Sequence, residues 1–187
     1  MLQYVKGLTV PTVRVLLPDM GQPKCVKEWF ANKELFTSEL AKGRKWQLFV
    51  ADRIRDLGYE AIVPDSVPYE GQAKAANFIN EPDILVNDVI IEVKSRSYKF
   101  TCAADFPFDT LGVDTKRSFD GKTDKPLIYV CVCQHSGSMT ALDVQKTRKH
   151  WVEIRRFDRV RNIPVVSYDC HKKHWEELSV VCKRILG

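Results

Sequence analysis

The stretch EPDILVNDVIIEVKSR, residues 81 to 96, contains charged residues where a buried strand is expected. Glu92 and Lys94 interrupt the apolar run VIIEVK, and both would point to one face because side chains alternate across a strand. Asp83 begins the preceding apolar run, DILV. Two carboxylates and an ammonium group can hold a divalent cation and stabilise charge on a phosphoryl group, provided that the fold brings them together.

A tight hairpin would bring these groups together. Asn87 and Asp88 separate the two apolar runs, and such a pair is typical of a two-residue turn between antiparallel strands. This turn pairs the residues on either side of it and, three positions further out, pairs Asp83 with Glu92. We therefore expect both carboxylates in one small area.

Adjacent carboxylates that are partly buried repel each other, and a divalent cation would relieve the repulsion. Mg²⁺ takes only one or two protein carboxylates and keeps several waters, so we expect Asp83, Glu92 and the Val93 carbonyl to bind it, with Mn²⁺ able to substitute. The metal would activate water, and Lys94 could hold or help deprotonate that water or offset charge on the phosphate. The alternative is a structural Glu–Lys pair at a sheet edge, with Asp83 capping a turn; a buried ion pair adds little net stability and would need another reason to be there.

The elements that would position this hairpin are predicted from apolar periodicity. Apolar residues recur at helical spacing from residue 38 to residue 57, and Gly58 follows where a helix commonly ends. The segments YEAIV (59–63) and PLIYVCVC (126–133) predict strands, and MTALDV (139–144) is expected to pair with the second. This order predicts an α/β fold with a mixed central β-sheet flanked by helices.

The chain of 187 residues is expected to form one domain, with its core at about 38–133. Residues 1–36 would be an N-terminal extension with a strand near 12–17 and a short helix at 26–36. In the ambiguous segment 97–125, TLGVDT is strand-like. The segment 144–187 combines a basic stretch with a last amphipathic helix, for which Asp169 is the expected N-cap.

The hairpin residues resemble those of a known nuclease superfamily. Pro82-Asp83, eight residues, and then Glu92-Val93-Lys94 match the PD-(D/E)XK pattern of restriction-endonuclease-like nucleases, on the hairpin where that superfamily carries it. The preceding KGRKWQLFVADRIRDLGYEAIV looks like the first helix and strand of that core, as in Holliday-junction resolvases. The resemblance covers roughly residues 38 to 96 and implies a restriction-endonuclease-like core.

The first helix departs from the pattern. Many members of the superfamily complete the metal site with a Glu a few residues after a helix glycine, but counting from Gly43 leads to Gln47. Gln47 shares a face with apolar residues, so it is expected to point toward the sheet, where its amide could support the site without adding charge. Glu39 is a weaker substitute.

Positive charge is concentrated near the C-terminus. The net charge is +5, and the segment 144–162 holds seven Lys or Arg against Glu153 and Asp158. Such a segment with aromatics among the charges is typical of a surface that contacts a phosphate backbone, although a solvated charged face fits equally well. The residues expected to bind nucleic acid are Arg96, Lys146, Arg148, Lys149, Arg155, Arg156, Arg159 and Arg161, and for Arg96 a plain surface role fits as well.

Other classes of protein are disfavoured. No apolar run reaches the roughly 20 residues that cross a bilayer, and the six cysteines form no CxxC pair, so we expect an intracellular, cytoplasmic protein with reduced thiols. Cys170, His171 and His174 lack the second ligand pair of a zinc site.

We therefore expect a Mg²⁺-dependent DNA endonuclease with Asp83, Glu92, Lys94 and Gln47 at its catalytic site. The alternative is a catalytically weak or inactive nuclease fold that binds nucleic acid or a protein partner, of which Gln47 would be a sign. A homodimer or an accessory partner that supplies specificity stays open, because no sequence-reading module is recognisable. The small size suits a phage or mobile-element protein.

Overall fold

The computed structural model describes residues 33–65, 80–158 and 162–187, with side chains from residue 41 onward. The strand expected near 12–17, most of the helix expected at 26–36, and the side chains of Glu39, Arg159 and Arg161 lie outside the described part. No helix in that part is long and apolar enough to span a membrane.

A mixed five-stranded sheet forms the centre, in the order β1-β2-β3-β5-β6. Its strands are β1 (Ala61–Ile62), β2 (Ile84–Val86), β3 (Val89–Arg96), β5 (Ile128–Cys133) and β6 (Met139–Asp143). The pair of β3 and β5 is parallel, and the other three pairs are antiparallel. This confirms the predicted α/β class and its mixed sheet.

The hairpin of β2 and β3 has the predicted register. Val86 pairs with Val89, and Ile84 pairs with Ile91. Asn87 in the turn has a φ of 52°, a left-handed conformation that Asn tolerates better than most residues. The register leaves Asp83 as the next residue beyond β2, beside the middle of β3.

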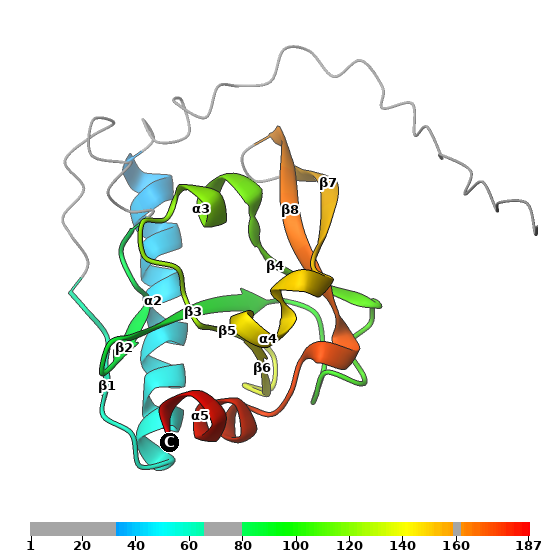
Figure 1. The fold of residues 1–187 in the computed structure, drawn as a ribbon. Coiled ribbons are helices and arrows are strands. Elements are labelled where there is room, and N and C mark those ends of the chain that lie inside the picture. The colour runs from blue at the N-terminus through cyan, green and yellow to red at the C-terminus, as the bar shows by residue number, and fades with distance from the viewer. Residues whose placement is uncertain (1–32, 66–79, 159–161) are drawn as a thin grey trace, which may run out of the picture.

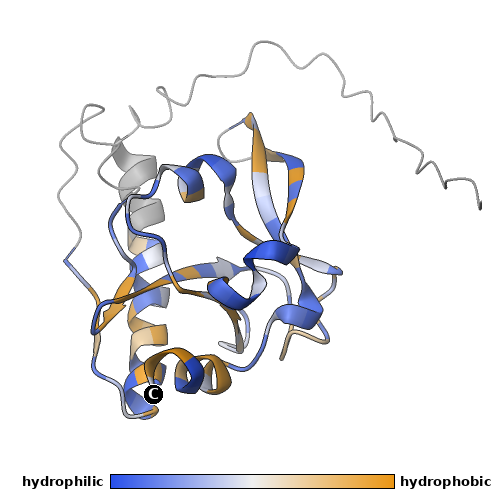
Figure 2. Cartoon of the chain, in the orientation of Figure 1, coloured by the Kyte–Doolittle hydropathy of each residue, from blue (hydrophilic) through white to orange (hydrophobic). Residues whose placement is uncertain are grey.

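Helices cover one face of this sheet (Figure 1). α2 (Lys33–Asp56) contributes Val50, Ala51 and Ile54 to an apolar cluster with the sheet, and α5 (Leu178–Leu186) packs against the same cluster. Gly58, with a φ of 93°, follows the end of α2 as predicted. Figure 2 shows that hydrophobic residues concentrate in the central strands and α5.

A second sheet covers the other face, which the sequence did not predict. It has the order β4-β8-β7, built from β4 (Thr110–Thr115), β8 (Ile163–His171) and β7 (Val152–Asp158). The strand-like TLGVDT is therefore confirmed as β4. Its apolar side chains join those of β5, β6 and β8 in a second buried cluster.

Short helical segments connect these strands. α3 (Lys116–Gly121) follows β4 directly, and α4 (Val144–Thr147) with the 3₁₀ turn Arg148–His150 links β6 to β7. A further 3₁₀ turn, Lys172–His174, follows β8. Of these segments, α3 lies next to the candidate active site.

The expected N-cap at Asp169 is wrong. Asp169 lies inside β8 and is fully buried, because the run VVSYDCH continues a strand in which side chains alternate. The N-cap of α5 is Glu177, eight residues later, and the helix begins at Leu178. The basic segment, for which no secondary structure was predicted, contains the strand β7.

Candidate active site

Two hydrogen bonds hold the Asp83 carboxylate, one from β3 and one from α2. One carboxylate oxygen accepts a hydrogen bond from the backbone N–H of Val93 at 2.7 Å, and the other accepts one from the side-chain amide of Gln47 at 2.6 Å. The predicted orientation of Gln47 toward the sheet is thus confirmed. In this arrangement Gln47 donates to the carboxylate and orients it, while Val93 meets Asp83 through its N–H.

Glu92 is buried on β3 and contacts two lysines. Its Oε2 accepts a hydrogen bond from Lys94 Nζ at 3.1 Å, and its Oε1 accepts one from Lys122 Nζ at 2.6 Å. Lys94 was expected here because it shares a face with Glu92. Lys122 was not, since it lies in the polar stretch KTDK, where nothing in the sequence marks it as buried.

A third carboxylate, Asp114, enters the site from β4 of the second sheet. Its Oδ1 lies 3.5 Å from Lys94 Nζ, and its Oδ2 accepts hydrogen bonds from the Tyr129 hydroxyl at 3.0 Å and from Ser118 Oγ at 3.2 Å. Lys94 therefore bridges the two sheets through Glu92 and Asp114. Asp114 was missed, although an acid inside the strand TLGVDT is the same kind of signal that identified Glu92.

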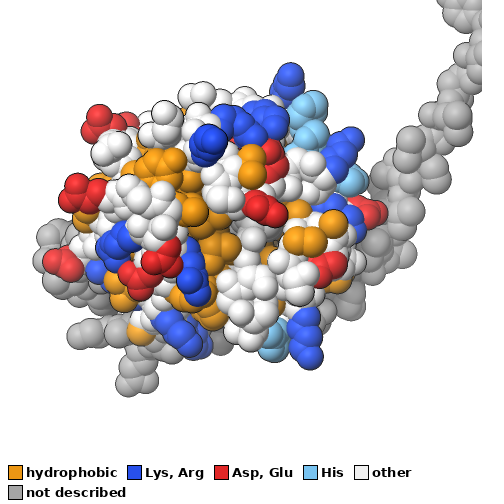
Figure 3. Space-filling model, turned by 90° about the horizontal axis from the view of Figure 1, so that it is seen from below, with side chains coloured by type: hydrophobic (Ala, Val, Ile, Leu, Met, Phe, Trp, Pro, Cys, Tyr) orange, Lys and Arg blue, Asp and Glu red, His pale blue; other side chains and the backbone are white. Residues whose placement is uncertain are grey.

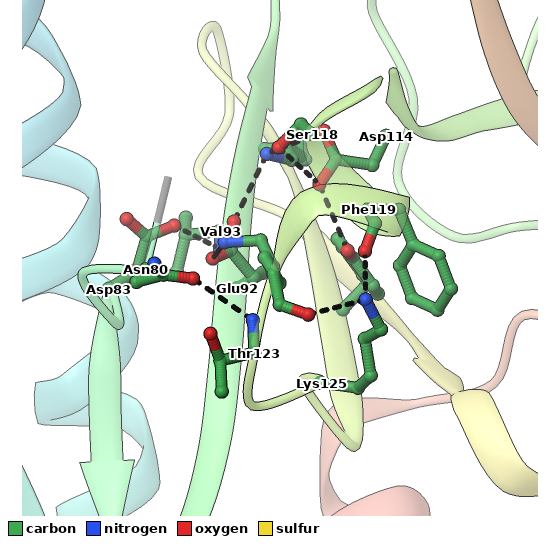
Figure 4. A network of polar contacts seen from close by, with 12 residues as sticks. Asn80, Asp83, Glu92, Val93, Asp114, Ser118, Phe119, Thr123 and Lys125 are labelled. Carbon is green, nitrogen blue, oxygen red and sulfur yellow. Dashed lines mark hydrogen bonds and ion pairs between the residues drawn. The ribbon is translucent and has the colours of Figure 1, made fainter. Parts of the chain in front are cut away.

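The segment that carries Lys122 is fixed by its own hydrogen bonds (Figure 4). Lys125 Nζ donates to the carbonyl oxygens of Phe119 and Lys122, both at 2.5 Å. The N–H of Thr123 donates to Asn80 Oδ1 at 3.0 Å, which ties the segment to the chain that leads into β2. These contacts hold Lys122 against Glu92.

The site contains more acidic than basic groups. Three carboxylates face two ammonium groups, so the five groups carry one net negative charge when all are ionised; they are Asp83, Glu92, Asp114, Lys94 and Lys122. Burial first, and the charge of Glu92 second, raise the pKa of Asp83 to about 7. The Lys94 ammonium already acts to lower this pKa, and a divalent cation beside Asp83 would lower it further.

The ammonium group of Lys94 stays protonated at neutral pH. Burial alone would lower its pKa, but the Asp114 and Glu92 carboxylates outweigh burial and raise the pKa above its ordinary value. Lys94 is therefore suited to holding a water or offsetting negative charge rather than to removing a proton. Of the roles expected from the sequence, the structure favours these two.

Asp83 and Glu92 are the residues of the site that could hold Mg²⁺. Asp83 and Glu92 offer hard carboxylate oxygens with an excess of negative charge, and Mg²⁺ commonly takes two such ligands and completes its shell with water and phosphate. Among the described residues, no group of three or more His, Cys, Asp or Glu is arranged so that it could hold a metal ion. Because both oxygens of Glu92 accept from lysines, a cation there would replace or share one of those contacts.

Three of the predicted nucleic-acid-binding residues contact other side chains: Lys146 and Arg156 form ion pairs, and Arg148 contacts aromatic rings. Lys146 pairs with Glu176 at 2.8 Å, and Arg156 pairs with the buried Asp169. The Arg148 guanidinium lies over three aromatic rings, nearest to Tyr168 at 4.6 Å. The remaining described members, Lys149 and Arg155, are exposed, and Arg96 is half-buried. Figure 3 shows acidic and basic side chains intermixed on the face seen from below in Figure 1.

Comparisons of the chain with protein-family models, with curated proteins and with solved structures find no match.

Proposed function

We propose that the protein is a Mg²⁺-dependent nuclease that hydrolyses phosphodiester bonds in DNA, cutting internally, with Mn²⁺ able to substitute. The observation that carries the proposal is spatial: residues that match a nuclease motif in the sequence lie together in one partly buried cluster. Asp83 directly precedes the first strand of the hairpin, Glu92 lies in the second, and Lys94 contacts Glu92 directly. Gln47, predicted from the same resemblance, reaches Asp83 from α2.

Each residue would have a distinct role. Asp83 and Glu92 would hold the cation, with the Val93 carbonyl as the third protein ligand expected from the sequence. The bound metal would supply an activated water and stabilise charge on the phosphoryl group. Lys94, which stays protonated, would donate to the attacking water or to a phosphate oxygen.

Two further residues support this arrangement. Asp114 holds the Lys94 ammonium from β4, and Gln47 fixes the orientation of the Asp83 carboxylate. Neither needs to touch the substrate to affect the reaction, because a misplaced donor loses most of its effect. Both are positioning residues.

A second candidate function is a nuclease fold that binds nucleic acid without cutting it. Two observations favour it: Gln47 stands where an acid would complete the metal site, and Lys122 already neutralises Glu92. In such a protein the lysine would replace the cation permanently. DNA binding would then be insensitive to divalent metal.

Cleavage of plasmid and branched DNA in Mg²⁺ tests the proposal. We expect the parent to cut and Asp83→Asn and Lys94→Met to lose at least 100-fold in rate, in line with the loss of one preorganised group. Asp52→Asn is the matched control, because Asp52 is an exposed acid of α2 that pairs only locally with Arg55. Equal cutting by parent and Asp83→Asn would refute the assignment.

Titration with Mn²⁺ in a calorimeter separates the two candidates. A nuclease site should bind the ion, and Glu92→Gln should abolish that binding. A binding module should hold DNA with a salt dependence set by its Lys and Arg and should not respond to Mn²⁺.

A further inference from the structure

The charged row on β3 continues past the candidate active site. Glu92, Lys94 and Arg96 point to one face of the strand, so the Arg96 side chain starts roughly 7 Å beyond that of Lys94. β4 lies opposite this row: Asp114 faces Lys94, and the carbonyl oxygen of Gly112 accepts a hydrogen bond from Arg96 Nη2 at 3.0 Å. Arg96 therefore lies between the two sheets.

A second guanidinium, from β7, reaches the same place. A Cβ added to Gly112 would lie 2.9 Å from Arg156 Nη1 and 3.6 Å from Arg96 Nη2. Arg156 Nη1 therefore lies closer than a Cβ at this position would allow, while Arg96 Nη2 and Asp169 Oδ1, at 3.7 Å, would be in ordinary contact with that Cβ. The glycine leaves room for the Arg156 guanidinium beside Arg96.

The charges at this point do not cancel. Arg156 pairs with Asp169, which is fully buried and also accepts from Thr110 Oγ1 at 3.1 Å and Ser167 Oγ at 2.9 Å. Arg96 donates to the backbone carbonyls of Ser95 and Gly112, which carry no net charge. Two guanidinium groups against one carboxylate leave one positive charge.

The convergence is open to a ligand. The side chain of Arg156 is 43% exposed, and Arg96 and Gly112 are half-buried. The buried Asp169 carboxylate holds Arg156, and the hydroxyl groups of Thr110 and Ser167 hold Asp169. Two like charges brought together at a surface, with one of them anchored, form a fixed donor set for an anion.

We propose that Arg96 and Arg156 together bind a backbone phosphate of DNA that neighbours the phosphate at the Asp83–Glu92 site. This inference rests on the proposed function for its placement, because the two sites lie on one row of β3. Guanidinium forks match the oxygens of a phosphodiester, and the remaining positive charge offsets its single negative charge. Gly112 matters because a side chain at this position would displace the Arg156 guanidinium.

Fluorescence anisotropy of a labelled DNA duplex in EDTA tests the site without any metal. We expect Arg96→Met to weaken binding about tenfold, the size of one charge-assisted contact, and to lower the slope of log affinity against log salt by about one. Gly112→Ala should weaken binding in the same direction without changing any charge, since its Cβ displaces Arg156 Nη1. Arg156→Lys keeps a positive charge opposite Asp169 but removes the planar guanidinium. Weaker DNA binding by this variant would therefore reflect the lost guanidinium and not an unpaired buried carboxylate.

The matched control is Arg53→Met, which removes an exposed arginine of α2 that pairs with Asp56. It should leave DNA binding within twofold of the parent. Unchanged affinity and salt slope in Arg96→Met and Gly112→Ala would overturn the phosphate site, even if the parent cuts DNA in Mg²⁺. Conversely, a protein that never cuts but shows these binding losses would overturn the proposed function and retain the site.

Discussion

Substitution of Lys122 by Met is the change that most sharply probes the balance of charge at the site. It removes one of the two ammonium groups that neutralise Glu92 while leaving Lys94 in place. The five ionisable groups then change from one to two net negative charges when all are ionised. We expect opposite effects on stability without metal and on affinity for a divalent cation.

The size of the stability loss follows from the burial of the pair. The side chains of Lys122 and Glu92 are each 5% exposed, and Nζ lies 2.6 Å from Oε1. Loss of one partner of a buried ion pair costs about 3 to 5 kcal/mol, and Lys94 still compensates Glu92 in part, so we expect about 3 kcal/mol. For a chain of this length that lowers Tm in EDTA by roughly 6 to 12 °C.

The affinity for metal should change in the other direction. Without Lys122 a cation no longer competes for Oε1 of Glu92, and it enters a more negative site. We expect Mn²⁺ to bind at least about tenfold more tightly, which corresponds to about 1.4 kcal/mol. Saturating Mn²⁺ should therefore recover more stability in Lys122→Met than in the parent.

Calorimetric titration with Mn²⁺ and thermal unfolding with and without Mn²⁺ measure both effects. Lys116→Met is the control, because Lys116 lies in α3 and also pairs with a glutamate, Glu153, but at the surface. It should change neither quantity appreciably. Unchanged or weaker Mn²⁺ binding in Lys122→Met would refute the idea that this lysine takes the place of a cation at Glu92.

Three further outcomes follow from the same contacts. In EDTA, the free energy of unfolding should fall as pH rises from about 4 to about 7. The unfolded chain releases the Asp83 proton near its ordinary pKa of 3.8, whereas the folded protein keeps that proton up to about pH 7. The loss is at most about 4 kcal/mol, and urea unfolding of Asp83→Asn should show a flatter pH dependence. Asp114→Asn, which keeps an acceptor for the Tyr129 hydroxyl, should lower the cleavage rate in Mg²⁺ by roughly 10-fold to 100-fold through a misplaced Lys94; an unchanged rate would remove Asp114 from the site. Gln47→Glu brings a carboxylate against Asp83, so it should lower Tm in EDTA and tighten Mn²⁺ binding, and a variant that gains stability in EDTA would contradict the geometry.

The hairpin was predictable because its information is local. A two-residue turn at Asn87 and Asp88 fixes the register, and the register places Asp83 beside β3. The orientation of Gln47 toward the sheet was predictable for a related reason, since helical periodicity gives the face on which it lies, whereas its choice as a site residue came from the resemblance. In both cases short-range geometry decides the position of the side chain.

The remainder of the site depends on contacts between distant segments. Asp114 and Lys122 reach Glu92 and Lys94 because a second sheet packs on the first, and sequence periodicity does not show which sheets pack together. β7 was read only as a charged segment because its strand is mostly exposed and carries arginines in place of an apolar face. The pairing of Arg156 with Asp169 gives that charge a structural role.

The most direct measurement of the central claim is the rate at which supercoiled plasmid is nicked in Mg²⁺ by the parent and by Glu92→Gln. Glu92 has the side chain that joins the proposed cation, Lys94 and Lys122. We predict nicking by the parent that EDTA abolishes, and at least a 100-fold slower rate for a folded Glu92→Gln. Nicking by Glu92→Gln at the rate of the parent, or by the parent in EDTA, would contradict a metal-dependent site at Asp83 and Glu92.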